Sequence, residues 1–371
     1  MKSKIFTVLG AVAMTLATAN AQIKVATESG DLSIRFMGRT NFDLGVQLGA
    51  PDSLSNTNGV QMNDTRLGVV ANFDERFSAK IEVCYANKAI SFRDLWIGYK
   101  LNDNNSIQVG HFFMPYGAKI LGLGYKFVED ASVDFALCPS RKIGAALFHT
   151  SDNFNLTAGI FSDGSVDNAG QLKQGWNLSA KAIVRPIINE RTVLHFGAAP
   201  MFTHSPNNPS FTFKVPTPMM TEGNGIGKIS SGDNYNYGRY EVEALFITGR
   251  FYSEFHYMGV NANTPGDDNF KINGFYGQAS FLVIGDQAKY NKKTGLAAAP
   301  APKSLEVLAR VSRSNIQEDL HMTDLTIGAN YFINKNLNFK LNFIHSKSTV
   351  DIAGGVDQKY NWLQGRLQFS F

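Results

Sequence analysis

Short segments in which apolar and polar residues alternate recur along the whole chain. The last twelve residues, 360–371, show the pattern best, because Leu363, Leu367 and Phe369 occupy one set of alternate positions while Gln364 and Arg366 belong to the other. Successive side chains of a β-strand point to opposite faces, so a two-residue period predicts a strand with one apolar and one polar surface. We therefore predict an all-β protein.

About sixteen segments carry this period, which sets the size of the sheet. The clearest are 32–44, 67–73, 81–85, 95–99, 154–160, 176–184, 240–246, 305–311, 325–331, 337–343 and 360–371. Less regular segments fill the gaps at 105–112, 142–150, 191–203, 250–260 and 270–285.

The connections alternate between short and long. Asn-rich or Asp-rich turns occur at 74–76, 102–105, 151–153, 189–191 and 334–336, whereas long stretches lie at 50–59, 113–141, 163–174, 204–236, 261–269 and 349–359. Short turns on one side and long loops on the other are typical of a transmembrane antiparallel β-barrel of the outer membrane. A barrel of this size is too wide for its wall side chains to fill, so it is plugged or holds water. The 29 residues (141 − 113 + 1) of 113–141, the third connection on the long-loop side, suit a constriction loop better than a plug.

Two connections depart from that layout. Residues 87–89 are very few for an outer loop, and residues 286–303 are many for a turn on the short side. The second segment contains Lys289, Lys292 and Lys293 and an Ala/Pro run. It is either a solvated turn or a segment folded into the pore.

The first 21 residues have the features of a secretory signal peptide. Lys2 and Lys4 precede an apolar run from Ile5 to Leu16, and small residues end at Ala21. The run is too short for a helix that crosses about 30 Å of hydrocarbon. We predict cleavage after Ala21, leaving one barrel domain over 22–371 in the cell outer membrane.

Net charge gives little information about partners. Without Lys2 and Lys4 the chain has 33 basic residues (35 − 2) against 31 acidic ones, so no nucleic-acid partner is indicated. The apolar and aromatic outward positions favour membrane lipid and lipopolysaccharide instead.

Charged residues at inward positions are the candidate functional groups. When the barrel closes, the last strand neighbours the first, so the basic residues of strands one to three and of the last strand form one wall. The predicted pore-lining basic residues are Arg35, Arg39, Arg66, Lys80, Arg310 and Arg366, those of the constriction loop are Lys119, Lys126, Arg141 and Lys142, and Glu241, Glu243 and Glu254 form an opposing acidic wall.

These charges allow two interpretations. Guanidinium groups match phosphate oxygens with forked donors, so the basic wall would guide small anions such as phosphate. The alternative is that the cations pair with nearby carboxylates and keep the wall hydrated. The candidate partners are Asp43, Glu82, Asp94, Glu129, Asp130 and Asp134.

No arrangement of residues points to catalysis, a metal or a cofactor. The seven histidines show no metal-ligand spacing. His149 and Ser151 near a turn leave an outer-membrane lipase as a weak alternative, and the Gly-rich stretch 223–228 lacks the spacing of a phosphate-binding loop. Cys84 and Cys138 form either a disulfide that pins the third loop or two unrelated thiols.

Several segments, in order, resemble the phosphate-selective porins O and P of bacterial outer membranes. They are LWIGYKLNDNNSIQVGHFFMPYG (95–117), FVEDASVDFALCPSRKIGAALF (127–148), FYGQASFLVIGDQAKY (275–290), SLEVLARVSRSN (304–315) and LTIGANYFINKNLNFKLNF (325–343). The resemblance implies a homotrimer of sixteen-stranded porins whose pores are narrowed by inward-folded loops. We predict passive diffusion of small solutes with a mild preference for anions; the alternative is a structural or adhesive barrel with a blocked lumen.

Overall fold

A computed structural model describes most of the mature chain predicted above. The described residues are 22–27, 30–48, 58–86, 89–118, 126–162, 174–204, 212–215, 227–230, 236–262, 270–316, 320–349 and 358–371. The predicted signal peptide, Lys119 and residues 223–226 lie outside them.

Nearly all of the described chain is strand. The first half contains β1 (Gln22–Thr27), β2 (Gly30–Leu48), β3 (Asn58–Asn72), β4 (Phe77–Ala86), β5 (Ala89–Lys100), β6 (Asn105–Phe113), α2 (Ser132–Leu137), β7 (Arg141–Thr150), β8 (Phe154–Ser162), β9 (Trp176–Ile188) and β10 (Thr192–His204). The second half contains β11 (Thr212–Val215), β12 (Gly227–Ser230), β13 (Asn236–Thr248), β14 (Phe251–Ala262), β15 (Phe270–Ile284), β16 (Lys289–Asn291), β17 (Leu296–Ala298), β18 (Ser304–Ile316), β19 (Leu320–Phe332), β20 (Leu337–Ser348) and β21 (Gln358–Ser370). No helix among the described residues is long and apolar enough to cross a bilayer.

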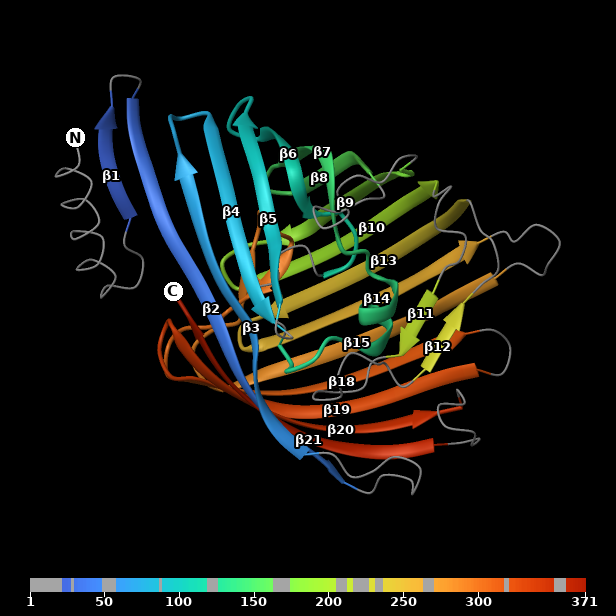
Figure 1. Cartoon of the computed structure of the whole chain (residues 1–371). Helices are drawn as coiled ribbons and strands as arrows, with labels where there is room; N and C mark the ends of the chain where they lie inside the picture. The colour runs from blue at the N-terminus through green and yellow to red at the C-terminus, as the bar shows by residue number, and fades with distance from the viewer. Residues whose placement is uncertain are drawn as a thin grey trace.

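The main sheet closes on itself. It contains 17 strands, of which β1 is paired with the start of β2 and the other 16 (17 − 1) form an antiparallel barrel (Figure 1). Closure comes from pairing of the first barrel strand, β2, with the last, β21, from Arg39–Ser370 to Leu48–Asn361. The sixteen-stranded barrel confirms the prediction from alternation.

The closing seam is fixed by the chain terminus. Phe371 N donates to Gly38 O at 3.0 Å and Gly38 N donates to Phe371 O at 3.1 Å. A Cβ at Gly38 would lie 2.5 Å from the Phe371 ring, so a glycine is required where that ring covers β2. The carboxyl-terminal aromatic residue thus completes the barrel.

The two faces of the wall separate by polarity as the alternation predicts. On β21 Leu363, Leu367 and Phe369 are 36–41% exposed, whereas Gln364 and Arg366 are at most 5% exposed. Apolar side chains therefore point outward and polar ones inward, the arrangement that a lipid environment requires.

The tight turns share one hydrogen-bond pattern. The side-chain oxygens of Asp74, Asn102, Asn189 and Asn334 each accept from the backbone N–H groups two and three residues ahead. This is the Asx turn, in which a short polar side chain replaces a backbone acceptor. The two backbone donors lower the pKa of Asp74 below its usual value.

Four features were not predicted from alternation. They are β1, the β11–β12 hairpin, the six-residue helix α2 and the β16–β17 hairpin. All are short, and their apolar residues follow no sustained period that a sequence reading could detect.

The β16–β17 hairpin, within residues 285–303, folds into the lumen rather than out into solvent. Asn155 of β8 donates its Nδ2 to Lys292 O at 2.7 Å, and a Cβ at Gly295 would lie 2.4 Å from Ile183 Cδ1 on β9. Ala288 and Tyr290 also cover Val193, Leu245 and Ile247, apolar side chains that face inward near this end. The second of the two alternatives for residues 286–303 is therefore correct.

The facing assignment on β20 gives a stability prediction. Leu341 is 40% exposed at the middle of the strand, and Leu337 begins the strand on the same face. We expect Leu341→Arg to lower the free energy of unfolding in phospholipid bilayers by about 2–4 kcal/mol, because a charge at the bilayer midplane is poorly solvated.

The matched control is Leu337→Arg, for which we expect a loss of about 0–1 kcal/mol at the interface. Urea titrations in the same lipid measure both. Equal losses at the two positions would contradict the outward assignment or the placement of Leu341 at the midplane.

Candidate functional site: the lumen of the barrel

The connection between β6 and β7 contacts the inner face of the opposite wall. We call residues 114–140 the third connection; 114–118 and 126–140 of it are described. The Tyr116 hydroxyl donates to Tyr240 O at 2.7 Å, and Val128 N donates to Asn342 Oδ1 at 2.6 Å. These acceptors lie on β13 and β20, which fixes the connection to separate parts of the lumen wall.

Apolar packing supplements those hydrogen bonds. Val133 and Leu137 of α2 are fully buried in a cluster with inward-facing Met258, Val260 and Ile272 of β14 and β15. Inward positions that are apolar here thus avoid water through contact with α2. Much of this part of the lumen is consequently occupied by protein.

The inner face of β2–β7 has cations and carboxylates in alternation, which we call the charge ladder. Arg66 pairs with Asp64 at 2.5 Å and with Glu82 at 3.1 Å, and Lys80 pairs with Glu82 at 2.7 Å and with Asp94 at 2.5 Å. Arg39 and Arg141 complete it by pairing with Asp64 and Asp94, respectively.

At the closing seam the ladder continues onto β21. Arg366 donates Nε and Nη2 to the two carboxylate oxygens of its register partner Asp43 at 2.6 and 2.7 Å. Together these pairs contain five cations and four carboxylates, a difference of +1 (5 − 4). Arg35, the remaining basic residue of the predicted wall, is exposed near the start of β2.

Asp64 is a partner that lies just outside the predicted segment 67–73. It is two residues before Arg66, so an unbroken two-residue period already puts both side chains on one face. Its φ is +59°, and the β2–β3 register shifts between Arg39 and Asn41, a bulge that lets the adjacent Asn63, which donates to Asp43, face the lumen as well. An aspartate near the middle of a strand between two inward arginines is the signal that could have indicated it.

The acids predicted to form an opposing wall are buried beneath the third connection. Glu241, Glu243 and Glu254 are 2, 6 and 8% exposed. Gly117 N donates to Glu241 Oε2 at 2.6 Å. The expected transverse field between two solvent-facing walls therefore needs correction, because these carboxylates are buried and Glu241 holds the third connection to the wall.

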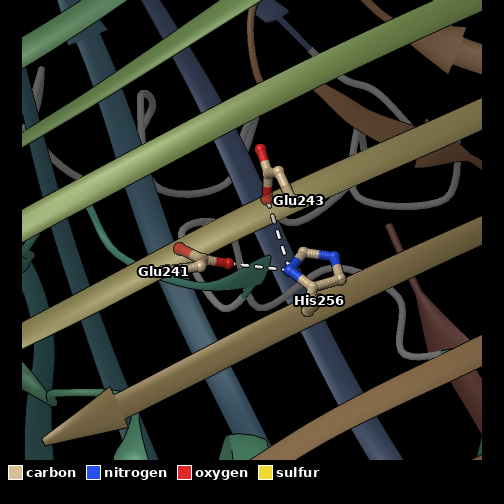
Figure 2. A group of neighbouring side chains, drawn as sticks. All are labelled: Glu241, Glu243 and His256. Carbon is tan, nitrogen blue, oxygen red and sulfur yellow. Dashed lines mark hydrogen bonds and ion pairs between the residues drawn. The ribbon is translucent and has the colours of Figure 1, made fainter.

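His256 lies between two of these glutamates (Figure 2). Its Nδ1 is 2.7 Å from Glu241 Oε1 and 3.4 Å from Glu243 Oε2. Lys181 of β9 donates to Glu243 Oε2 at 2.7 Å and lies 3.7 Å from Glu241. The negative charge of the pair is thus compensated by neighbouring cationic donors.

Among the described residues, Glu241, Glu243 and His256 also form the group whose side chains are spaced like metal ligands. Ligand atoms of Glu241, Glu243 and His256 lie within 4.8 Å of one another. A divalent ion among them would lie close to the Lys181 ammonium, which already occupies Glu243 Oε2. Charge repulsion makes this arrangement an internal ion network rather than a metal site.

Basic residues of the third connection and the facing wall are also engaged. Lys126 Nζ lies 2.5 Å from Glu306 Oε1, and Arg310 donates to the backbone oxygens of Glu129 and Asp130 at 2.9 and 3.2 Å. Lys142, at the start of β7, is partly buried. These contacts hold the connection close to β18.

A cavity of about 540 Å³ lies between the third connection, the β16–β17 hairpin and the inner wall. Its lining combines basic, acidic and amide side chains with the Ala/Pro run of 297–302. Among the charged groups are Lys126, Glu306, Arg310 and Lys340. A space of this size with charged groups in its lining can hold water and small hydrated solutes.

The two sulfur atoms are far from forming the disulfide considered above. Both cysteines are free. Cys84 on β4 contacts Asp64 at 3.3 Å, and Cys138 after α2 donates to Asp134 at 2.7 Å. The bridge is therefore incorrect, because each sulfur contacts a different aspartate, Asp64 for Cys84 and Asp134 for Cys138.

No contact supports the lipase alternative. His149 Nδ1 is bonded to Asn105 Oδ1 at 2.9 Å, while the Ser151 hydroxyl donates to Phe154 O at 3.0 Å. Each side chain serves a turn instead of activating a nucleophile.

Sequence comparison assigns the family of this chain. The family described as phosphate-selective porin O and P matches residues 34–371, nearly the whole chain. The chain belongs to this porin family. No curated protein matched the chain.

Solved structures with the same barrel have dissimilar sequences. An anion-selective porin from Comamonas acidovorans has 12% identity and a TM-score of 0.61, over 92% of this chain and 100% of that one. OmpT from Vibrio cholerae with loop L8 deleted has 13% identity and a TM-score of 0.62, over 92% and 99%. The channel DcaP from Acinetobacter baumannii has 11% identity and a TM-score of 0.58, over 94% and 99%. These likenesses support the fold, and with the family they point to an outer-membrane porin channel.

Glu82 gives a test of the charge ladder because it pairs with two cations. We expect Glu82→Gln to raise anion permeability about twofold to fourfold and to lower cation permeability by the same factor, so that their ratio rises about fourfold to fifteenfold. One unit charge at about 10 Å contributes about 0.4–0.8 kcal/mol at an effective dielectric constant of about 40–80. Zero-current potentials under a KCl gradient measure the ratio.

The matched control is Glu75→Gln in the exposed turn of the same β3–β4 hairpin. This charge is screened by bulk salt, so the ratio should stay unchanged. A change of equal size in both variants would show that Glu82 acts through net protein charge and not through the lumen.

A titrating carboxylate in the third connection predicts a pH effect. Burial raises the pKa of Glu129 to about 7, with Arg366 acting in the opposite direction. The group is neutral below that pKa and negative above it, so anion preference should be higher at pH 6 than at pH 8. Zero-current potentials at both pH values should differ in the wild type and by less in Glu129→Gln; an unchanged difference in the variant would assign the effect to other groups.

Proposed function

We propose that this porin forms a water-filled pore for passive diffusion of small solutes, with a mild preference for anions such as phosphate. The observation that carries this proposal is the charge ladder with its closing-seam pair, which faces the lumen with five cations against four carboxylates. A small excess of fixed positive charge concentrates anions where the surrounding dielectric is low.

The chemistry of the ladder suits weak and reversible binding. Arginine presents forked donors that fit phosphate oxygens, but Arg39, Arg66 and Arg366 are already paired with carboxylates. An entering anion would compete with those carboxylates and bind loosely, which favours passage over retention. The anion-selective Comamonas porin shows that this fold supports anion preference in another protein.

Export and assembly complete the proposal. Residues 1–21 would be removed as a signal peptide. The mature barrel would meet lipid and lipopolysaccharide through its outward apolar face and assemble as a homotrimer. OmpT of Vibrio cholerae, which has a similar fold, has been solved in a trimer form.

A structural or adhesive barrel is the second candidate. Its specific support is the extent to which the third connection and the β16–β17 hairpin occupy the lumen. Absence of ion current through correctly folded protein would favour this candidate over a pore.

Phosphate titration tests the anion pore directly. With purified protein in a planar bilayer, we expect chloride current to fall as phosphate is added. Arg66→Ala should weaken the block severalfold, because it removes a lumen guanidinium, whereas Arg35→Ala at the exposed start of β2 should weaken it less. Current that is insensitive to phosphate in all three proteins would leave a general porin without this preference.

A further inference from the structure

One side chain lies between two anchors of the segments that enter the lumen: Glu243, which helps to hold the third connection, and Tyr290 of the β16–β17 hairpin. The third connection enters from one end of the barrel and the β16–β17 hairpin from the other. His195 of β10, 1% exposed, contacts both anchors. Its Nε2 lies 2.9 Å from Glu243 Oε1, and its Nδ1 lies 3.1 Å from the Tyr290 hydroxyl.

The Glu243 side leads to the third connection. Lys181 Nζ donates to Glu243 Oε2 at 2.7 Å and to Gly117 O at 2.9 Å. Gly117 has a φ of +70°, and a Cβ there would lie 2.3 Å from Cys138 Sγ. The backbone that Lys181 holds is therefore packed tightly against Cys138.

The Tyr290 side leads into the hairpin. Arg185 donates Nη1 to the Tyr290 hydroxyl at 3.3 Å and Nη2 to Asn155 Oδ1 at 2.7 Å. Asn155 in turn holds Lys292 O. Gly295 at the turn of the hairpin also lies close to His195, because a Cβ on Gly295 would be 3.6 Å from His195 Cε1.

The donors and acceptors along this path fit one arrangement. The Glu243 carboxylate only accepts, so His195 Nε2 carries a proton. The Tyr290 oxygen accepts from Arg185, which leaves its own hydrogen to donate to His195 Nδ1. Each contact then orients the next one.

We propose that His195 is a positioning residue that couples the third connection to the β16–β17 hairpin. The coupling path, which we call the relay, consists of Arg185, Tyr290, His195, Glu243, Lys181 and Gly117. Buried hydrogen-bonded side chains in a continuous series depend on one another for their orientation. Loosening the hairpin therefore loosens the third connection, so the two constrictions of the proposed pore respond together.

Labelling of Cys138 reports on the third connection without depending on ion selectivity. Tyr290→Phe removes one hydroxyl from the hairpin and keeps its ring. We expect the rate at which a small methanethiosulfonate reagent modifies Cys138 to rise about threefold to tenfold, the effect of losing the hydrogen bond to His195, which is the one of the hydroxyl's two hydrogen bonds that leads to the third connection. Mass spectrometry of the Cys138 peptide distinguishes it from Cys84.

The control removes a hairpin contact that lies outside the relay. Lys292 Nζ pairs with Asp152 Oδ1 at 2.7 Å in an exposed position, and Asp152→Asn should leave the Cys138 rate unchanged. In a His195→Leu background, which interrupts the relay, Tyr290→Phe should add nothing further.

An unchanged rate in Tyr290→Phe, or equal rates in Tyr290→Phe and Asp152→Asn, would overturn the coupling. An undiminished effect of Tyr290→Phe in the His195→Leu background would overturn it too. If His195→Leu does not fold, the first comparison decides alone. Conductance is measured separately from Cys138 labelling. A negative labelling result therefore leaves the pore proposal standing, and absence of current leaves the relay standing.

Discussion

Closure of the sheet is the constraint on which the rest of the structure depends. Pairing of β2 with β21 leaves no strand edge, as a barrel in lipid requires. The same closure with sixteen strands encloses more space than wall side chains can fill. Every other feature of the interior is a way to occupy or hydrate that space.

The interior is occupied differently on its two sides. Along β2–β7 the cations and carboxylates pair with one another at the wall, so each charge is compensated by a neighbour on the wall itself. Along β9–β14 the acids are covered by the third connection and compensated by Lys181 and His256. The β2–β7 side thus lines a polar path through the lumen, and the β9–β14 side holds the segments that narrow this path.

The sequence predicted the features that depend on period and turn chemistry. Alternation assigned Leu341 outward and Arg366 inward correctly, and the Asx residues located the tight turns. It missed Asp64 because the predicted segment 67–73 begins after that residue, and it could not show the bulge that brings the adjacent Asn63 to the same face. Nor could it show that Glu241 and Glu243 are covered, since covering depends on contacts between residues more than a hundred positions apart.

The same limit explains residues 286–303. A lysine-rich segment with an Ala/Pro run suits solvent as well as a lumen, and only the inward-facing Val193, Leu245 and Ile247 make its burial favourable. Those residues lie on other strands, so the local sequence leaves both alternatives open. The inward-facing apolar positions near the tight-turn end are the signal that could have decided between them.

We propose that the lumen conducts ions while protein narrows it from both ends. Single-channel conductance of the wild type and of a variant with residues 286–302 replaced by a short turn, in the same bilayer and salt, tests it most directly. We expect a conducting wild type and a larger conductance in the shortened, folded variant. A silent wild type, or equal conductances, would contradict it.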